Sequence, residues 1–318
     1  MKARVAGAAL ITAMLTVSLV ASLAATALSQ QWRNVEIESA EKARDQSVWV
    51  LTGALDWARL ILREDGRSGG ADYLAEPWAI PLEEARISTF LAADKTTSDE
   101  DLMQQLFLSG RISDLQGRLN VYNLVDDTKV SDPDLRAFTK LFQLLGLPEA
   151  ELATLADNLR LARDTRSEAG PDAQVPLLPQ RLDQLVWLGL SPASLARLRP
   201  YITLLPVRTP VNVNTASVQV LYASIATLDL AQAQRLAGLR QISHFRSLAD
   251  VSKAVGEVAG QLNEAQHSVS SRFFEVRGRL RQDQTLVEER SVVQRNGMNV
   301  TVLWRELGAP PAPAPPLQ

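Results

Sequence analysis

An uncharged stretch near the N-terminus limits what this chain can fold into more than any other feature. No charged side chain occurs from Val5 to Trp32, and the apolar run Ala8–Leu28 would form a helix of roughly 30 Å. That length matches the hydrocarbon core of a bilayer. Lys2 and Arg4 precede the run, so the positive-inside tendency predicts a cytoplasmic N-terminus and an exported remainder.

Three interpretations of this stretch are open. It could be a cleaved secretory signal peptide, for which Ala25-Thr26-Ala27 offers a cleavage site, although the run is longer than the usual apolar region of roughly 7–15 residues. It could be a plain transmembrane anchor. In the third interpretation a short basic leader ends at Gly7 and is removed, and the apolar helix stays on the mature protein.

The sequence after Trp32 bears on this choice because it continues as an amphipathic helix. Apolar residues recur at three-, four- and seven-residue steps as far as Arg63, and no proline interrupts residues 8–63. We expect one helix over 8–63, about 80 Å long, with a transmembrane part at 8–28 and an amphipathic stem at 29–64. A signal peptide does not run without a break into a packed helix. The basic stub that ends at Gly7 then favours the third interpretation.

The composition excludes several classes of function. Lys and Arg total 33 against 36 Asp and Glu, which argues against a strongly basic nucleic-acid binder. There is no cysteine, so disulfide scaffolds, zinc ribbons and thiol catalysis are excluded. The only histidines, His244 and His267, have no carboxylate at catalytic spacing, and no phosphate-binding or hydrolase motif occurs. We predict two structural histidines and a protein that is not an enzyme; an exported enzyme has no positive support.

Two regions have the pattern of β-strands. Residues 110–124 are typical of strands around a turn at Gln116-Gly117, and runs at 272–281, 284–293 and 298–305 are rich in Val, Leu, Phe and Thr. The last two runs flank Arg295-Asn296-Gly297, the strongest hairpin signal in the chain. A short helix is expected over Asp99–Phe107. We predict a small antiparallel head built from residues 65–125 and 268–306.

The residues between the β regions are predicted to form an inserted all-α domain at 126–267. Gly146 and Pro148 would end its first helix, and a cluster of leucines at 185, 188, 190, 195 and 198 would be core. The fold class is therefore α+β, with a long N-terminal helix, a small antiparallel sheet and a helical insertion. The proline-rich tail at 307–318 should be disordered. Helices are expected at 131–145, 149–163, 182–188, 192–199, 216–225, 230–242 and 248–255, with a loop at 170–179.

An acidic cluster stands at the entry of the insertion, formed by Asp126, Asp127, Asp132 and Asp134. Clustered carboxylates in a loop can hold calcium, so calcium is the one cofactor to consider. The cluster lacks the spacing of an EF-hand loop. A solvated loop that caps the following helix is the favoured alternative.

The stretch Val211–Ala216 resembles the entrance of helix-hairpin-helix modules, which grip DNA phosphates. This gives a second hypothesis, a membrane-anchored periplasmic DNA-binding protein. Such a hairpin needs a glycine so that backbone amides face the phosphate. Here the turn Ala226–Asp229 has no glycine, and Asp229 would repel phosphate. We therefore expect no nucleic acid as partner, and we interpret Asn214 or Thr215 as the N-cap of a buried helix.

Three stretches together resemble the K-type minor pseudopilins of type II secretion systems (the GspK family). They are Gly7–Leu15, Ser109–Leu124 and Pro210–Ala216, and their order and spacing extend the resemblance to about Glu306. The resemblance implies a pilin-like head with a SAM-like inserted domain. It also implies a structural subunit at the tip of the pseudopilus that helps initiate its assembly to export folded proteins.

The resemblance further implies processing and partners. A prepilin leader peptidase would cut between Gly7 and Ala8 and methylate the new N-terminus. Thr12 then takes the fifth mature position, where most pilins carry a glutamate that pairs with a neighbour's ammonium inside lipid. The other partners would be the I-type and J-type minor pseudopilins, the major pseudopilin and the inner-membrane secretion platform. The chain would cross the bacterial inner membrane once, with its head in the periplasm.

Overall fold

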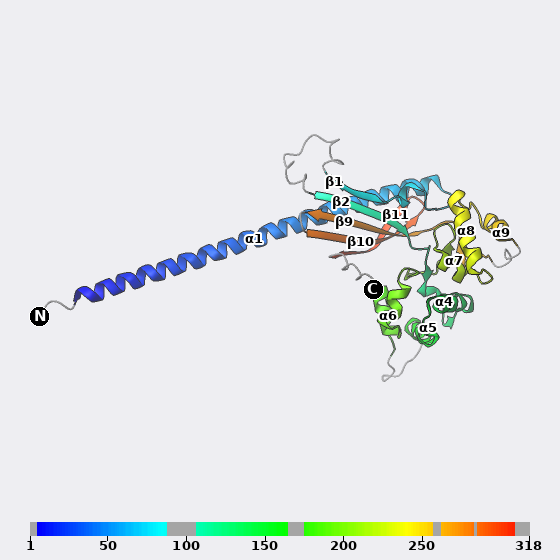
Figure 1. Ribbon diagram of the computed structural model, residues 1–318, viewed down its shortest axis with the longest axis horizontal. Coiled ribbons are helices and arrows are strands. Elements are labelled where there is room, and N and C mark those ends of the chain that lie inside the picture. Colours follow the sequence, from blue (N-terminus) through cyan, green and yellow to red (C-terminus); the bar gives the residue numbers. More distant parts are fainter. Residues whose placement is uncertain (1–4, 88–105, 165–174, 257–261, 283–284, 309–318) are drawn as a thin grey trace. The chain divides into compact units, whose positions relative to one another are not determined.

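The computed structural model describes residues 5–87, 106–164, 175–256, 262–282 and 285–308. It divides into two compact units, residues 1–53 and residues 54–318. The long helix belongs to both units, and the sheet and the shorter helices all belong to the second (Figure 1).

The N-terminal helix α1 runs without interruption over Val5–Ser68, and it is long and apolar enough to cross a membrane. Most hydroxyls of its apolar half donate to carbonyls of the preceding turn, as Thr16 Oγ1 does to Ala13 O at 2.9 Å. This satisfies polar groups that lipid could not. The helix ends where Gly69 and Gly70 take φ of 65° and 114°. The predicted continuous helix is confirmed, and it extends three residues earlier and five later than expected.

The sheet is antiparallel and has five strands in the order β1-β2-β9-β10-β11 (Figure 1). Its last hairpin closes at Asn296↔Asn299, where Gly297 has a φ of 59°, so the predicted asparagine-glycine turn is confirmed. The expected helix at 99–107 lies outside the described residues up to 105, and its last two residues belong to β2, where they pair with β9. The strands are β1 Leu82–Arg86, β2 Leu106–Asp114, β9 Phe273–Gln282, β10 Thr285–Asn296 and β11 Asn299–Gly308.

One face of this sheet is covered by the last turns of α1. Leu55, Ala58 and Leu62 of the helix share a buried cluster with residues of β2, β9, β10 and β11. Trp78, in the short 3-10 helix η1 (Pro77–Ala79), packs edge-on against Phe274 with ring centroids 5.1 Å apart. The apolar stripe of the stem thus becomes the core of the head, which is why its spacing repeats every three to four residues.

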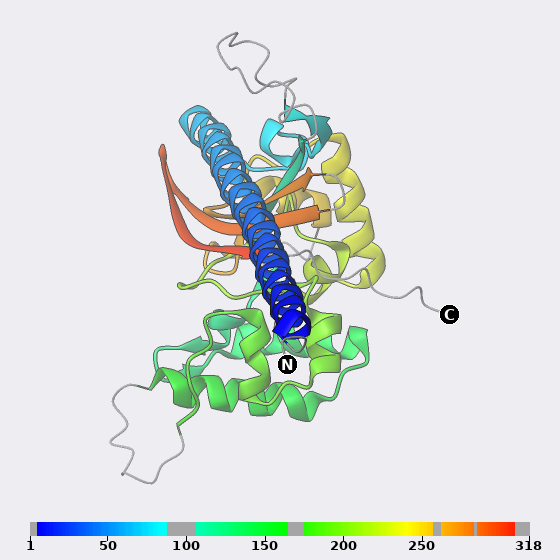
Figure 2. The same cartoon turned by 90° about the vertical axis from the view of Figure 1, so that its left-hand side faces the viewer.

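The helices lie in the predicted insertion, and Figure 2 shows α4, α5 and α6 (green) lying together as one group. They surround a second, larger buried cluster that includes the five predicted core leucines. Gly146 ends α4 in the left-handed conformation, with φ 60°. The elements are α4 Asp132–Leu145, α5 Glu149–Arg163, η3 Leu182–Leu188 (a 3-10 helix), α6 Pro192–Leu198, α7 Val218–Ser224, α8 Leu230–Ile242 and α9 Leu248–Val255.

Short strand pairs join the segments around these helices. β3 (Leu119–Asn120) pairs in parallel with β6 (Ile202–Thr203), and β7 (Val211–Asn212) with β8 (His267–Ser268). The helical core itself reaches back to Leu119. The predicted domain boundaries stay a prediction. β11 includes residues 307 and 308, and the remainder of the proline-rich tail lies outside the described residues. The other short elements are η2 Val121–Leu124, β4 Val125–Asp126 and β5 Lys129–Val130.

Candidate functional site

The junction between sheet and helices is organised by one buried carboxylate, Asp114, at the end of β2. Its side chain is only 8% exposed. One oxygen accepts hydrogen bonds from Asn212 Nδ2 (3.0 Å), Thr215 Oγ1 (2.6 Å) and Ser271 Oγ (2.6 Å), and the other accepts the backbone N–H of Gln116 (2.7 Å). Burial raises the pKa of Asp114 despite these bonds. A single side chain thereby ties β2 to the segments that enter α7 and β9.

The asparagines of the 210–216 stretch form hydrogen bonds to segments that are distant in the sequence. Asn214 receives the backbone N–H of Phe245 on its amide oxygen and donates to the carbonyl of the same residue, both at 2.9 Å. The prediction that Asn214 or Thr215 caps α7 is therefore wrong. The N-cap is Ser217, whose Oγ accepts the N–H of Val220 at 3.3 Å. Both predicted residues precede the helix and are already engaged, Thr215 by Asp114.

The turn at Gln116-Gly117 brings two distant stretches of sequence into contact. A Cβ on Gly117 would stand 2.9 Å from Thr215 Oγ1 and 3.2 Å from the Thr215 carbonyl oxygen, so only glycine allows this approach. Gln116 spans the joint, since its amide donates to Pro210 O (3.1 Å) and accepts from Arg272 N (2.7 Å). The 109–124 and 210–216 stretches together form this junction.

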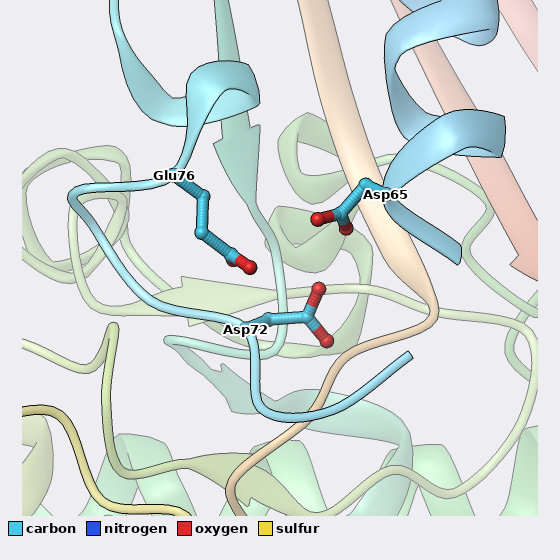
Figure 3. A group of neighbouring side chains, drawn as sticks. All are labelled: Asp65, Asp72 and Glu76. Carbon is cyan, nitrogen blue, oxygen red and sulfur yellow. The ribbon is translucent and has the colours of Figure 1, made fainter. Parts of the chain in front are cut away.

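A second polar cluster lies where α1 ends, and Figure 3 shows its three carboxylates, from Asp65, Asp72 and Glu76, pointing toward one another. Their oxygens lie within 4.8 Å of one another. The buried guanidinium of Arg295 pairs with Asp65 and with Asp72, the latter at 2.6 Å. Glu76 instead accepts N–H groups from Tyr73 and Trp78, at 2.8 Å each.

Electrostatics decides what this cluster can hold. Burial raises the pKa of Glu76 to about 7, with the negative charges of Asp65 and Asp72 adding to the rise. A proton on Glu76 and the guanidinium of Arg295 together supply positive charge that clustered carboxylates need. A metal ion would have to compete with both, so we assign none to this cluster. Sequence reasoning missed the cluster, because Arg295 lies 230 residues from Asp65 and no local pattern links them.

Comparisons with known proteins now bear on this architecture. Two models of the family described as "Type II secretion system (T2SS), protein K" match residues 117–207 and 211–270, which meet at the junction. A curated relative from Pseudomonas aeruginosa, named "Type II secretion system protein K", is 29% identical over 292 residues, covering 85% of this chain and 83% of its own length. The chain is similar to the protein K family of type II secretion systems.

A solved structure supports the fold of this chain. "The Crystal Structure of the GspK-GspI-GspJ complex from enterotoxigenic Escherichia coli Type 2 Secretion System" contains a similar chain, with a TM-score of 0.60 and 18% identity. The match covers 85% of this chain and 99% of that one. The predicted resemblance is confirmed, as is the α+β fold, and the chain is a minor pseudopilin of the type II secretion system.

The four aspartates predicted as a calcium site do not form one group in this chain. Asp126, Asp127 and Asp132 are exposed, Asp127 with a φ of 53° in the β4–β5 turn. Asp134 is buried, where it pairs with Arg208 at 2.7 Å and accepts a bond from Ser131 at 2.6 Å. Within the described parts of the chain, the only three carboxylates with oxygens all within 4.8 Å are those at the end of α1. Calcium binding by the four aspartates stays a prediction.

The turn between α7 and α8, where a helix-hairpin-helix protein would hold phosphate, is occupied by a lysine. Lys140 Nζ donates to the carbonyls of Ile225, Ala226 and Leu228, at 3.1 Å each. Asp229 caps α8 by accepting the N–H of Gln232. Carbonyls directed at a cation, beside an aspartate, disfavour a phosphate here.

Neither histidine lies in the described carboxylate cluster. His244 stacks on Tyr73 with ring centroids 3.8 Å apart, and His267 is buried with Nε2 3.3 Å from Ser224 O. Burial lowers the pKa of His267, which favours its neutral form. Both contacts are structural in kind.

The predicted processing site lies at the start of α1. Gly7 and Ala8 are helical, and the side chain of Ala8 is outside the described part of the chain. Thr12 is exposed, and its Oγ1 donates to Ala9 O at 2.9 Å. Cleavage between Gly7 and Ala8 stays a prediction.

Proposed function

We propose that this minor pseudopilin occupies the tip of the pseudopilus and helps initiate its assembly for the export of folded proteins. The observation that carries the proposal is Thr12, the fifth residue after the predicted cleavage site. A glutamate at that position in lipid needs a neighbour's charge, because an unpaired buried ion is costly. The threonine hydroxyl is instead bonded within its own helix, to Ala9 O. Such a subunit is best tolerated where one neighbour is missing, at an end of the fibre.

The bulk of the helical insertion supports the same position. Helices α4 to α9 fall within residues 132–255, in addition to the five-stranded sheet. Well over 100 residues is the size of an independent domain, and stacking one above every joint would crowd the next head. A shaft subunit could not repeat at close spacing with this insertion, whereas a single copy at the tip meets no head above it.

We propose the I-type and J-type minor pseudopilins as direct partners. The similar solved structure is of a complex of three proteins of this kind. The stem offers a surface for such partners, because several large apolar side chains on α1 are exposed, including Trp49 (77%) and Trp57 (52%). An amphipathic helix with aromatic residues left exposed is a typical helix-docking surface. The major pseudopilin and the inner-membrane secretion platform would be met as the fibre grows.

Processing and location complete the proposal. The prepilin leader peptidase would remove residues 1–7 and methylate Ala8, and α1 would hold the chain in the inner membrane with the head in the periplasm. The role is structural: we propose no reaction and no nucleic acid partner.

Two measurements test the proposal. Mass analysis of the membrane form should find Ala8 as a methylated N-terminus, whereas a terminus at Leu28 would contradict the pilin-type processing. The full-length chain, purified in detergent, should retain the I-type and J-type subunits. The matched variant Trp49→Glu should lose them, since a charge in a packed helix interface is costly. A wild-type chain that stays alone with both subunits present would refute the partnership.

A further inference from the structure

A cavity of about 270 Å³ lies at the junction, and Asp114 is one of the residues that line it. Its polar lining includes two arginines, Arg111 and Arg118, and two serines, Ser113 and Ser217. Its apolar lining includes Leu74 and Trp78. Because β2, the 116–117 turn, η1 and the entry to α7 all contribute, the cavity exists only when sheet and helices are joined.

The guanidinium groups of the two arginines of this cavity have no acceptor among the described residues. Within the described parts of the chain, no hydrogen bond or ion pair engages either guanidinium. The carboxylate of the buried Glu275 attracts Arg118 electrostatically. Both oxygens of that carboxylate are already taken, one by Arg277 Nε at 2.7 Å and the other by Arg290 Nε. A half-buried guanidinium with five donors and no acceptor indicates a missing oxyanion.

The charge of the lining selects the kind of oxyanion. Arg111 and Arg118 contribute two positive charges, and Asp114 is the only acidic residue that lines the cavity. One monovalent carboxylate balances this difference, whereas a phosphate dianion would overshoot it beside Asp114. The exposed Leu74 and the other apolar lining residues suit a carboxylate carried on a protein segment, with a neighbouring apolar side chain, more than a free hydrated ion.

We propose that this cavity binds one carboxylate, the Asp or Glu side chain of a protein that docks against the junction, through the guanidinium groups of Arg118 and Arg111. Arg118 is fixed in the turn and provides the planar fork, and Arg111, which is exposed, closes over the bound group. The proposal rests on the proposed function in one respect, that the head is an assembly surface. The present proposal adds the place on the head where an acidic segment of a partner would bind.

The direct test uses the full-length protein in lipid nanodiscs and a defined probe. The probe is N-acetylglutamate α-amide, a monoanion that reproduces a glutamate side chain within a peptide, and binding is followed by isothermal titration calorimetry. We expect saturable binding to wild type, roughly ten-fold weaker binding to Arg118→Gln, and weaker binding to Arg111→Gln. The control Arg235→Gln removes an exposed arginine of α8 that lines no part of this cavity, and it should bind as wild type does.

Each other outcome has a definite meaning. Absence of saturable binding to wild type, or equal binding to Arg118→Gln, overturns the proposal. Inorganic phosphate binding more tightly than the probe overturns the choice of a carboxylate, and binding of the neutral N-acetylglutamine amide overturns the role of charge. If Arg118→Gln does not fold, Arg111→Gln and Arg118→Lys carry the test, because both leave a cation at the cavity. Co-purification with the I-type and J-type subunits does not enter this measurement, so failure of the proposed function would be seen separately.

Discussion

Replacement of Asp114 by alanine tests the junction, because this carboxylate is the acceptor that four donors share. Not all four would be stranded. Asn212 Nδ2 also donates to Asp72 O (3.1 Å) and Ser271 Oγ (2.9 Å), and Thr215 Oγ1 lies 3.4 Å from Asn212 O. Two donors would be left without another acceptor: the buried N–H of Gln116 and the hydroxyl of Ser271.

The magnitude follows from these losses. An unsatisfied buried donor costs about 1–3 kcal/mol, and a weakened hydroxyl bond to a charged group adds a similar amount. Removal of a desolvated carboxylate returns part of this. We expect Asp114→Ala to lower the free energy of unfolding by about 3 kcal/mol. Asp114→Asn keeps an oxygen for the Gln116 N–H but sets an amide donor against Asn212, so it should cost roughly half as much.

Urea unfolding of the purified protein, followed by tryptophan fluorescence, measures both values. Trp78 packs in the core of the sheet and its fluorescence should report loss of that packing. A loss of less than about 0.5 kcal/mol in the free energy of unfolding of Asp114→Ala would refute the claim that Asp114 organises the junction, since surface substitutions commonly fall in that range. If Asp114→Ala and Asp114→Asn lower the free energy of unfolding equally, the acceptor oxygen that asparagine keeps contributes nothing, and the full carboxylate is required.

Three further predictions concern other buried polar contacts. Arg295→Gln should lower the free energy of unfolding by about 3 kcal/mol or more, because it leaves Asp65 and Asp72 without their buried cation, and calcium should raise the melting temperature of this variant more than that of wild type. The pKa of Glu76 is about 7 in the folded protein against an ordinary 4.5, and the pKa of Asp72 is about 6 against an ordinary 3.8, so the folded state takes up protons as pH falls from 8 to 5. Wild type should therefore gain stability over this range, and in a thermal melt series Glu76→Gln should lose the part of the gain that Glu76 supplies and keep the part that comes from Asp72. Lys140→Met should lower the free energy of unfolding by about 1–2 kcal/mol by removing three bonds to carbonyls of the α7–α8 turn, and an unchanged urea midpoint would show that the lysine is dispensable.

Local signals in the sequence predicted the elements well. The uninterrupted α1, the hairpin at Gly297 and the end of α4 at Gly146 each depend on a few adjacent residues, through proline absence, turn chemistry and left-handed glycine. Residues 182–188 were expected to be helical and form a 3-10 helix, a difference that periodicity over seven residues does not resolve.

Long-range polar contacts could not be predicted in the same way. Asn212 and Asp114 lie 98 residues apart, and the pattern around Asn214 and Thr215 resembled a helix cap because both residue types are common caps. In the structure both residues instead form hydrogen bonds to residues distant in the sequence. The true N-cap, Ser217, lies two residues after Thr215, and the sequence around it did not distinguish it from the two candidates. The cluster of carboxylates at the end of α1 could not be predicted for the same reason, since the arginine that pairs with two of them lies far along the chain, in β10.

Cysteine cross-linking along α1 tests the tip assignment most directly. The chain has no cysteine of its own, so a single cysteine at an exposed stem position such as Val35 reports only its neighbours in the assembled fibre. We expect cross-links to other pseudopilins and almost none between two copies of this chain. Thr12→Glu in the same background should leave this pattern unchanged, because the helical insertion still keeps the subunit out of the shaft. Abundant cross-links between copies in the wild-type fibre would contradict the account.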